Sequence, residues 1–225
     1  LAAGGDPGGD LLAILDSIDA RPMRTNDEDG RQLTVGLAWT GVIMAMYSPG
    51  LWPTLDGALV DVRDHGDGSG LLALADQYND RGPDGTYSNS TFAFMAISCI
   101  DDGPLDPAEE AEAAARLPEV APRVGPLFVS LPGPCEFWPV DPPSDAPTGP
   151  FSSPDAPPVV VVATTGDPAT PYAWGVQLAD ELETAVLISA EGDSHTSYAA
   201  GNSCVDDAVD AYLLELVVPD DGLSC

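Results

Sequence analysis

Two polar residues with complementary chemistry follow two apolar runs near the C-terminal end of the sequence. Asp167 lies in TTGDPATP, after a run of valines, and His195 lies in EGDSHTSY, just beyond a second apolar run. A carboxylate can accept the Nδ1 proton of an imidazole and stabilise the imidazolium that forms when the other ring nitrogen takes a proton from a nucleophile. The pair therefore predicts general acid–base chemistry.

Each residue also has a simpler interpretation. Asp167 precedes Pro168 and could serve only as a turn or helix-capping residue. His195 could be an ordinary loop histidine. Their joint placement favours catalysis, because loops at the carboxyl ends of strands carry the functional groups of open α/β sheets. The other histidine, His65, lies in RDHGDGSG. We expect it in a polar loop between helices, with a weak cation site as the alternative.

The elements that would position the pair alternate between strands and helices. Apolar β-branched runs predict buried parallel strands at 158–165 and 185–191. Apolar residues at helical spacing predict helices at 172–183 and 204–217. This order predicts an α/β fold with parallel strands and helices.

The residues before this α/β segment predict helices and no sheet. Residues 1–135 form a mostly helical region and residues 136–157 a Pro-rich connector, whereas 158–225 form the α/β segment. Asp106 and Pro107 mark the start of one helix, as its N-cap and first residue. The other helices are expected at 11–20, 33–47, 52–64 and 69–80.

The charge of the chain excludes some classes of partner. Of its 225 residues, 37 are acidic and 7 are basic, which gives a net charge of -30. Nucleic acid and anionic membrane surfaces are therefore not expected as partners. The acidic surface serves solubility or, alternatively, provides a site for a cationic group such as a peptide amino terminus. No apolar segment is long enough to predict a membrane span, and the first ten residues do not form a signal peptide.

The four cysteines, Cys99, Cys135, Cys204 and Cys225, are widely spaced and form no CxxC pair. Zinc-ligand spacing is therefore absent, and neither a metal nor a cofactor is predicted. The even number suggests two disulfides and an oxidising compartment. Of three possible pairings, the most local joins Cys99 to Cys135 and Cys204 to Cys225; free buried thiols are the alternative.

A nucleophile is missing from this pattern. The sequence contains no G-x-S-x-G, so no strained nucleophile elbow is predicted, and no Gly-rich oxyanion segment lies near the start. The residues supply two of the three groups of a Ser-His-Asp triad. The chain order Asp then His is the order that α/β-hydrolases use after their serine.

At these residues the sequence resembles the tripeptidyl aminopeptidase-like (TAP-like) branch of the α/β-hydrolase serine peptidases, downstream of the nucleophile. The matching segments include AMYSPGLWPTLDGAL, CEFWPV, GDPATPYAWGVQLADEL and GDSHTSYAAGNSCVDDAVDAYLL. The resemblance implies that Asp167 is the triad acid, that His195 is the triad base and that the helical region is largely a lid. Thr164 stands where a glycine commonly opens the turn, and Ser194 replaces the glycine usual before the histidine.

The resemblance also implies a function, which two hypotheses describe. In the first, the chain is the C-terminal portion of a secreted serine hydrolase, an aminopeptidase of the extracellular space or cell envelope that releases short peptides. Its partners are then a peptide substrate and the missing N-terminal half with the serine, and the isolated chain is inactive and prone to self-association. In the second, the chain is a non-catalytic acidic binding module that retains the hydrolase fold.

Overall fold

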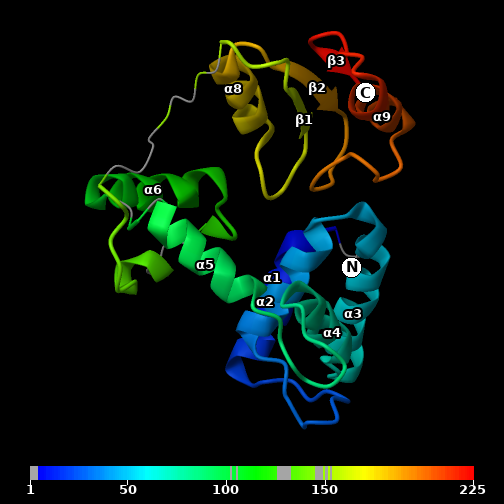
Figure 1. The fold of residues 1–225 in the computed structure, drawn as a ribbon. Coiled ribbons are helices and arrows are strands. Elements are labelled where there is room, and N and C mark those ends of the chain that lie inside the picture. The colour runs from blue at the N-terminus through cyan, green and yellow to red at the C-terminus, as the bar shows by residue number, and fades with distance from the viewer. Residues whose placement is uncertain are drawn as a thin grey trace. The chain divides into compact units, whose positions relative to one another are not determined.

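The computed structural model describes residues 5–101, 103–104, 106–125, 133–144, 149, 152 and 154–225 (Figure 1). The chain folds as two units. The first, here called the helical unit, comprises Leu1–Trp39 and Leu59–Pro147, and the second, the α/β unit, comprises Thr40–Ala58 and Thr148–Cys225. A segment of the predicted lid, Thr40–Ala58, is thus part of the α/β unit.

The α/β unit contains a parallel sheet of three strands. They are β1 (Val160–Thr164), β2 (Val186–Ala190) and β3 (Leu223–Ser224), in the order β1-β2-β3. The first two confirm the strands predicted from the apolar runs. The third was not predicted, because two residues carry no periodicity and β3 is defined only by its pairing with β2.

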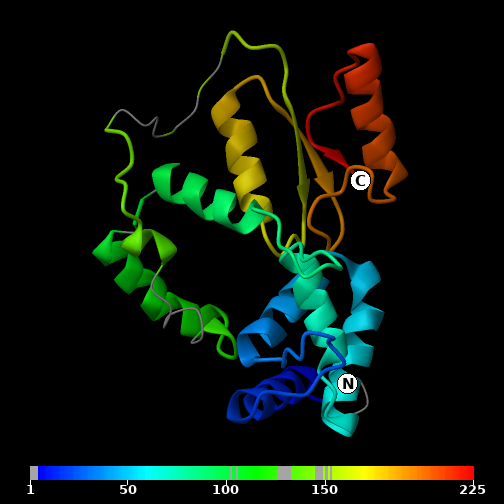
Figure 2. The same ribbon diagram turned by 60° about the horizontal axis from the view of Figure 1, so that its bottom comes forward.

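Two helices pack on this sheet, as Figure 2 shows: α8 (Tyr172–Leu182) follows β1, and α9 (Ser203–Glu215) follows β2. Val205 and Val209 of α9 pack with Ile188 and Ala190 of β2 in one buried cluster. On α8, a Cβ at Gly175 would lie 2.6 Å from the Cβ of Ala163, so only glycine permits this approach of helix to strand. Both helices confirm the sequence prediction.

The C-terminal residues are tied to the start of α9. A disulfide joins Cys204 to Cys225. The backbone N–H of Cys225 donates to the Ser189 carbonyl at 2.8 Å. Asn202 caps α9, because its side-chain oxygen accepts from the N–H groups of Cys204 and Val205. Together these contacts hold β3 beside β2.

Helices are also the main elements of the described residues up to residue 137. Their bounds are α1 (Pro7–Ala20), α2 (Val35–Met46), η1 (Pro49–Leu51), α3 (Trp52–His65), α4 (Ser69–Tyr78), α5 (Ser90–Asp101), α6 (Pro107–Val120) and η2 (Pro134–Phe137). As predicted, Asp106 caps α6 and accepts from the Ala108 N–H at 2.8 Å. The disulfide between Cys99 and Cys135 links α5 to η2.

The structure describes residues 136–144, 149, 152 and 154–157 of the predicted Pro-rich connector. Residues 136–137 complete η2, and the other described residues of the connector form no helix or strand. The rest of the connector lies outside the described residues. The predicted domain boundaries at residues 135 and 157 stay a prediction. Within the described ranges, no helix has both the length and the apolarity needed to cross a membrane.

Candidate active site

The candidate site lies where β1 and β2 end in neighbouring loops. The first loop continues the ladder, since the Thr165 N–H donates to the Ala190 carbonyl at 2.9 Å and the Gly166 N–H donates to the Gly192 carbonyl at 2.8 Å. A side chain at Gly166 would collide with the Gly192 carbonyl, because its Cβ would lie 2.7 Å from that oxygen. The glycine thus lets the loop with Asp167 approach the loop with His195.

The structure brings Asp167 and His195 into contact. Nδ1 of His195 lies 3.0 Å from Oδ2 and 3.1 Å from Oδ1 of Asp167. The Asp167 side chain is 5% exposed and that of His195 is 28% exposed. Among the described residues, Nε2 of His195 has no hydrogen-bond partner. A buried carboxylate therefore fixes one ring nitrogen and leaves the other free to exchange a proton.

Asp167 also forms the turn that its simpler interpretation predicted. Its Oδ1 accepts from the N–H groups of Ala169 and Thr170, both at 2.8 Å, and its Oδ2 accepts from the Thr170 hydroxyl at 2.9 Å. The Thr170 hydroxyl oxygen lies 3.5 Å from Nδ1 of His195. The two interpretations of Asp167 are thus compatible, because the turn orients the carboxylate that meets the imidazole.

These hydrogen bonds favour the ionised form of Asp167. Burial opposes ionisation of the carboxyl, but donation from the Thr170 and Ala169 amides, from His195 and from the Thr170 hydroxyl outweighs it and lowers the pKa of Asp167 to about 2. Asp167 is therefore ionised at neutral pH, as a group that stabilises an imidazolium must be.

A buried pair of hydroxyls connects β1 to the histidine loop. Thr164 is 3% exposed and Ser197 is 6% exposed, and their hydroxyl oxygens lie 2.6 Å apart. In the family that the sequence resembles, a glycine commonly stands at the position of Thr164. In this chain the hydroxyl of Thr164 forms a hydrogen bond with that of Ser197. Sequence reasoning did not select Ser197, since one serine in a polar loop carries no signal of burial.

The backbone that follows His195 is unusual. Thr196 has a φ of 65°, a left-handed conformation that is rare for a β-branched residue. The Ser194 hydroxyl donates to the Thr196 carbonyl at 2.9 Å, and the Thr196 N–H donates to Oδ2 of Asp167 at 3.4 Å. Ser194, which replaces the glycine usual before the histidine, thus stabilises this turn through its hydroxyl.

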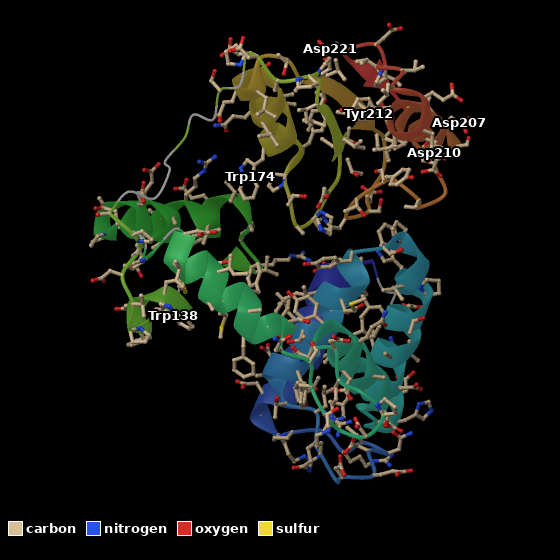
Figure 3. All side chains as sticks on the ribbon, viewed as in Figure 1. Trp138, Trp174, Asp207, Asp210, Tyr212 and Asp221 are labelled. Atoms are coloured by element: carbon tan, nitrogen blue, oxygen red, sulfur yellow. A yellow bond between two sulfur atoms is a disulfide. The ribbon has the colours of Figure 1, made fainter. Side chains whose placement is uncertain are left out.

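An open cleft of about 410 Å³ adjoins the pair. Its lining includes Asp167 and Thr170, the strand residue Val161 and the apolar side chains of Trp174 and Leu178 on α8. Trp174 is 61% exposed, and Figure 3 labels it on α8. The cleft thus combines a polar end with an apolar wall beside β1.

The remaining candidates lie elsewhere. His65 is the last residue of α3, and its Nδ1 lies 3.2 Å from Oδ1 of Asp61. In the part of the chain that the structure describes, no group of three or more His, Cys, Asp and Glu residues is placed to bind a metal. The four cysteines form the two local disulfides, so the described residues include no free thiol.

Known proteins are similar to this chain over the region that contains the candidate site. The α/β-hydrolase family described as "TAP-like protein" matches residues 121–225. Serine protease Hip1 of Mycobacterium tuberculosis is 42% identical over 210 residues, which are 92% of this chain and 39% of that protein. Carboxylesterase B of the same species is 42% identical over 174 residues, 76% of this chain and 33% of that protein.

The chain thus spans about two fifths or less of the length of these relatives. The family match covers the sheet, both loops and both disulfide-bonded C-terminal cysteines, and the match to the relatives extends into the helical region. The chain therefore belongs to the TAP-like branch of the α/β-hydrolases and carries a C-terminal portion of that fold.

Proposed function

We propose that this chain is the C-terminal portion of a serine hydrolase and supplies the acid and the base of a Ser-His-Asp triad. The contact between Asp167 and Nδ1 of His195 carries this proposal. Two residues that follow successive parallel strands meet there, with the carboxylate ionised and Nε2 unpartnered among the described residues. The similarity to a serine protease and to a carboxylesterase supports it.

In this function, Nε2 of His195 takes the proton of a serine hydroxyl as the serine attacks a carbonyl carbon. Asp167 stabilises the imidazolium, which then gives its proton to the leaving group as the acyl-enzyme forms. Nε2 of His195 then takes a proton from a water molecule as this water attacks the acyl-enzyme. The proton returns to the serine oxygen as the carboxylic acid leaves. The serine and the oxyanion hole come from a segment outside the chain, since the sequence contains no nucleophile elbow.

The serine-bearing segment is the proposed partner. Among the described residues, β1 pairs only with β2, so its other edge is open. The cleft beside β1 has an apolar wall that includes Trp174 and Leu178. We place a neighbouring strand of the hydrolase sheet at this edge, which would bring its serine to the same end of the sheet as His195.

The proposed substrate is a peptide with a free amino terminus, from which the enzyme releases short peptides. A carboxylic ester is the competing substrate, because one of the relatives is named a carboxylesterase. Transfer of an acyl group to serine is the first step in the hydrolysis of both peptides and esters. The two disulfides support an extracellular or cell-envelope location, where disulfides persist.

A chimera tests the function. This chain replaces the matching 210 residues of serine protease Hip1, and hydrolysis of an N-terminally unblocked peptide anilide is compared with that of a nitrophenyl ester. We expect turnover of the peptide by the chimera and none by the isolated chain. His195→Ala and Asp167→Asn should each lower kcat by about 10³-fold or more, as for other triads.

His65→Ala is the matched control, since it removes the other histidine and its contact with Asp61. It should leave kcat unchanged. Full activity of the His195→Ala chimera would refute the assignment. A folded chimera that binds peptides without turnover would instead favour the non-catalytic binding module.

A further inference from the structure

Tyr47, far upstream in the chain, contacts the candidate base at two points. The backbone N–H of His195 donates to the Tyr47 carbonyl at 2.9 Å. The two rings meet edge to face, with centroids 5.0 Å apart and an interplanar angle of 80°. Both residues belong to the α/β unit, because Thr40–Ala58 is part of it. One residue thus contacts both the backbone and the ring of the histidine.

The local sequence explains why Tyr47 can make both contacts. Helix α2 ends at Met46, and the Tyr47 N–H donates to the Met44 carbonyl at 3.3 Å. Carbonyl groups at a helix C-terminus lack partners within the helix, so the Tyr47 carbonyl can accept from another loop. Ser48 then caps η1, with its hydroxyl accepting from the Gly50 N–H, and this turn fixes the direction in which the chain leaves.

The histidine needs such contacts because its other restraints are incomplete. Asp167 holds the imidazole at Nδ1 alone, which leaves rotation of the ring about that contact. The next residue, Thr196, has a left-handed backbone, a conformation that persists only when surrounding contacts hold it. An edge-to-face neighbour restricts the plane of the ring, and the bond to the Tyr47 carbonyl restricts the backbone.

We propose that Tyr47 is a positioning residue for His195, which fixes the imidazole plane so that Nε2 is held ready for proton transfer. The inference rests on the proposed function in one respect, that His195 is the base. It makes turnover depend on the segment Thr40–Ala58, which the sequence assigned only to a lid. Substitutions at Tyr47 test the role of the ring, because the backbone carbonyl that accepts from His195 is present in every variant unless the backbone moves.

The first test uses the intact chain and needs no activity. With two histidines in the sequence, the imidazole protons of His195 and His65 can be assigned by NMR from His→Gln variants. Tyr47→Ala should shift the His195 ring protons, because the ring current of Tyr47 is lost, whereas Tyr47→Phe should leave them in place. His65 should not respond to either change. Trp52→Ala, which removes an exposed aromatic ring from the same segment, is the matched control.

The second test measures kinetics in the chimera. Tyr47→Ala should lower kcat by about 10- to 100-fold with little change in KM, since misplacing a catalytic group acts on the transition state. Tyr47→Phe should recover most of that loss. If Tyr47→Ala does not fold, Tyr47→Leu fills the space without an aromatic ring and gives the same comparison.

The outcomes separate this inference from the proposed function. Wild-type kcat and unshifted His195 protons in Tyr47→Ala, together with loss of turnover in His195→Ala, would overturn the role of Tyr47 and leave the proposed function standing. An equal fall in kcat for the Ala and Phe variants would also overturn it. Activity that survives His195→Ala would remove the proposed function itself, whatever the NMR spectra show.

Discussion

At the scale of single residues, Asp167 has two roles, one structural and one electrostatic. It forms a turn with the amides of Ala169 and Thr170, and it meets Nδ1 of His195. Asparagine at this position keeps an oxygen for the two amides but loses the charge. Asp167→Asn therefore separates the structural role from the electrostatic one.

This separation predicts how stability depends on pH. The pKa of Asp167 is lowered from 3.8 to about 2 in the folded chain. A lowered carboxyl pKa contributes stability that is present above the unfolded value and is lost as pH falls toward the folded value. The contribution is about 2 kcal/mol at neutral pH, and about half of it should be gone by pH 3.

Urea unfolding of the wild type and of Asp167→Asn, between pH 6 and pH 3, measures this dependence. The difference in unfolding free energy between the two proteins should shrink as the pH falls, because only the wild type loses the charge. A difference that stays constant over this range would show that the carboxylate is not held by these hydrogen bonds.

At the scale of elements, the strand end and the histidine loop are joined by the buried hydroxyls of Thr164 and Ser197. Thr164→Val or Ser197→Ala leaves the other hydroxyl buried without a partner, which should cost about 1 to 3 kcal/mol. The double variant has no unpartnered hydroxyl at this site, because both hydroxyls are removed. Its loss of unfolding free energy should therefore be clearly less than the sum of the two single losses. Urea unfolding of the four proteins gives the coupling.

The exposed hydroxyls of Ser88 and Ser90, 2.7 Å apart, provide the control cycle. Water replaces either partner at an exposed site, so their coupling should be much smaller. Additive losses at Thr164 and Ser197 would mean that their contact does not hold the loop.

Sequence patterns foresaw β1, β2, α8 and α9 because each contains enough apolar residues to show its period. They also favoured the pairing of Asp167 with His195, because loops after adjacent parallel strands emerge at the same edge of a sheet. They could not foresee β3 or the contact of Tyr47. A helical period shows that one face of α2 is buried, but not which distant loop will meet its end.

For the whole molecule, the open edge of β1 and the charge of -30 act in opposite directions. Within the described residues, β1 pairs on one side only, and its sequence VVVAT is apolar. Unpaired apolar edges promote association, whereas a large net charge opposes it until salt screens the repulsion. The isolated chain should therefore self-associate more as the salt concentration rises.

The direction of the backbone groups permits a specific test. The Val186 N–H donates to the Val159 carbonyl, and the Thr165 N–H donates to the Ala190 carbonyl. Because partners alternate along a parallel ladder, the amide of Val162 should face the open edge and that of Val161 should face β2.

Val162→Pro removes a donor from the edge and is tolerated there, so it should keep the fold and suppress association in sedimentation at high salt. Val161→Pro should instead lower the unfolding temperature. If Val162→Pro associates as the wild type does, the contact between chains lies elsewhere, and the open edge of β1 is not its cause.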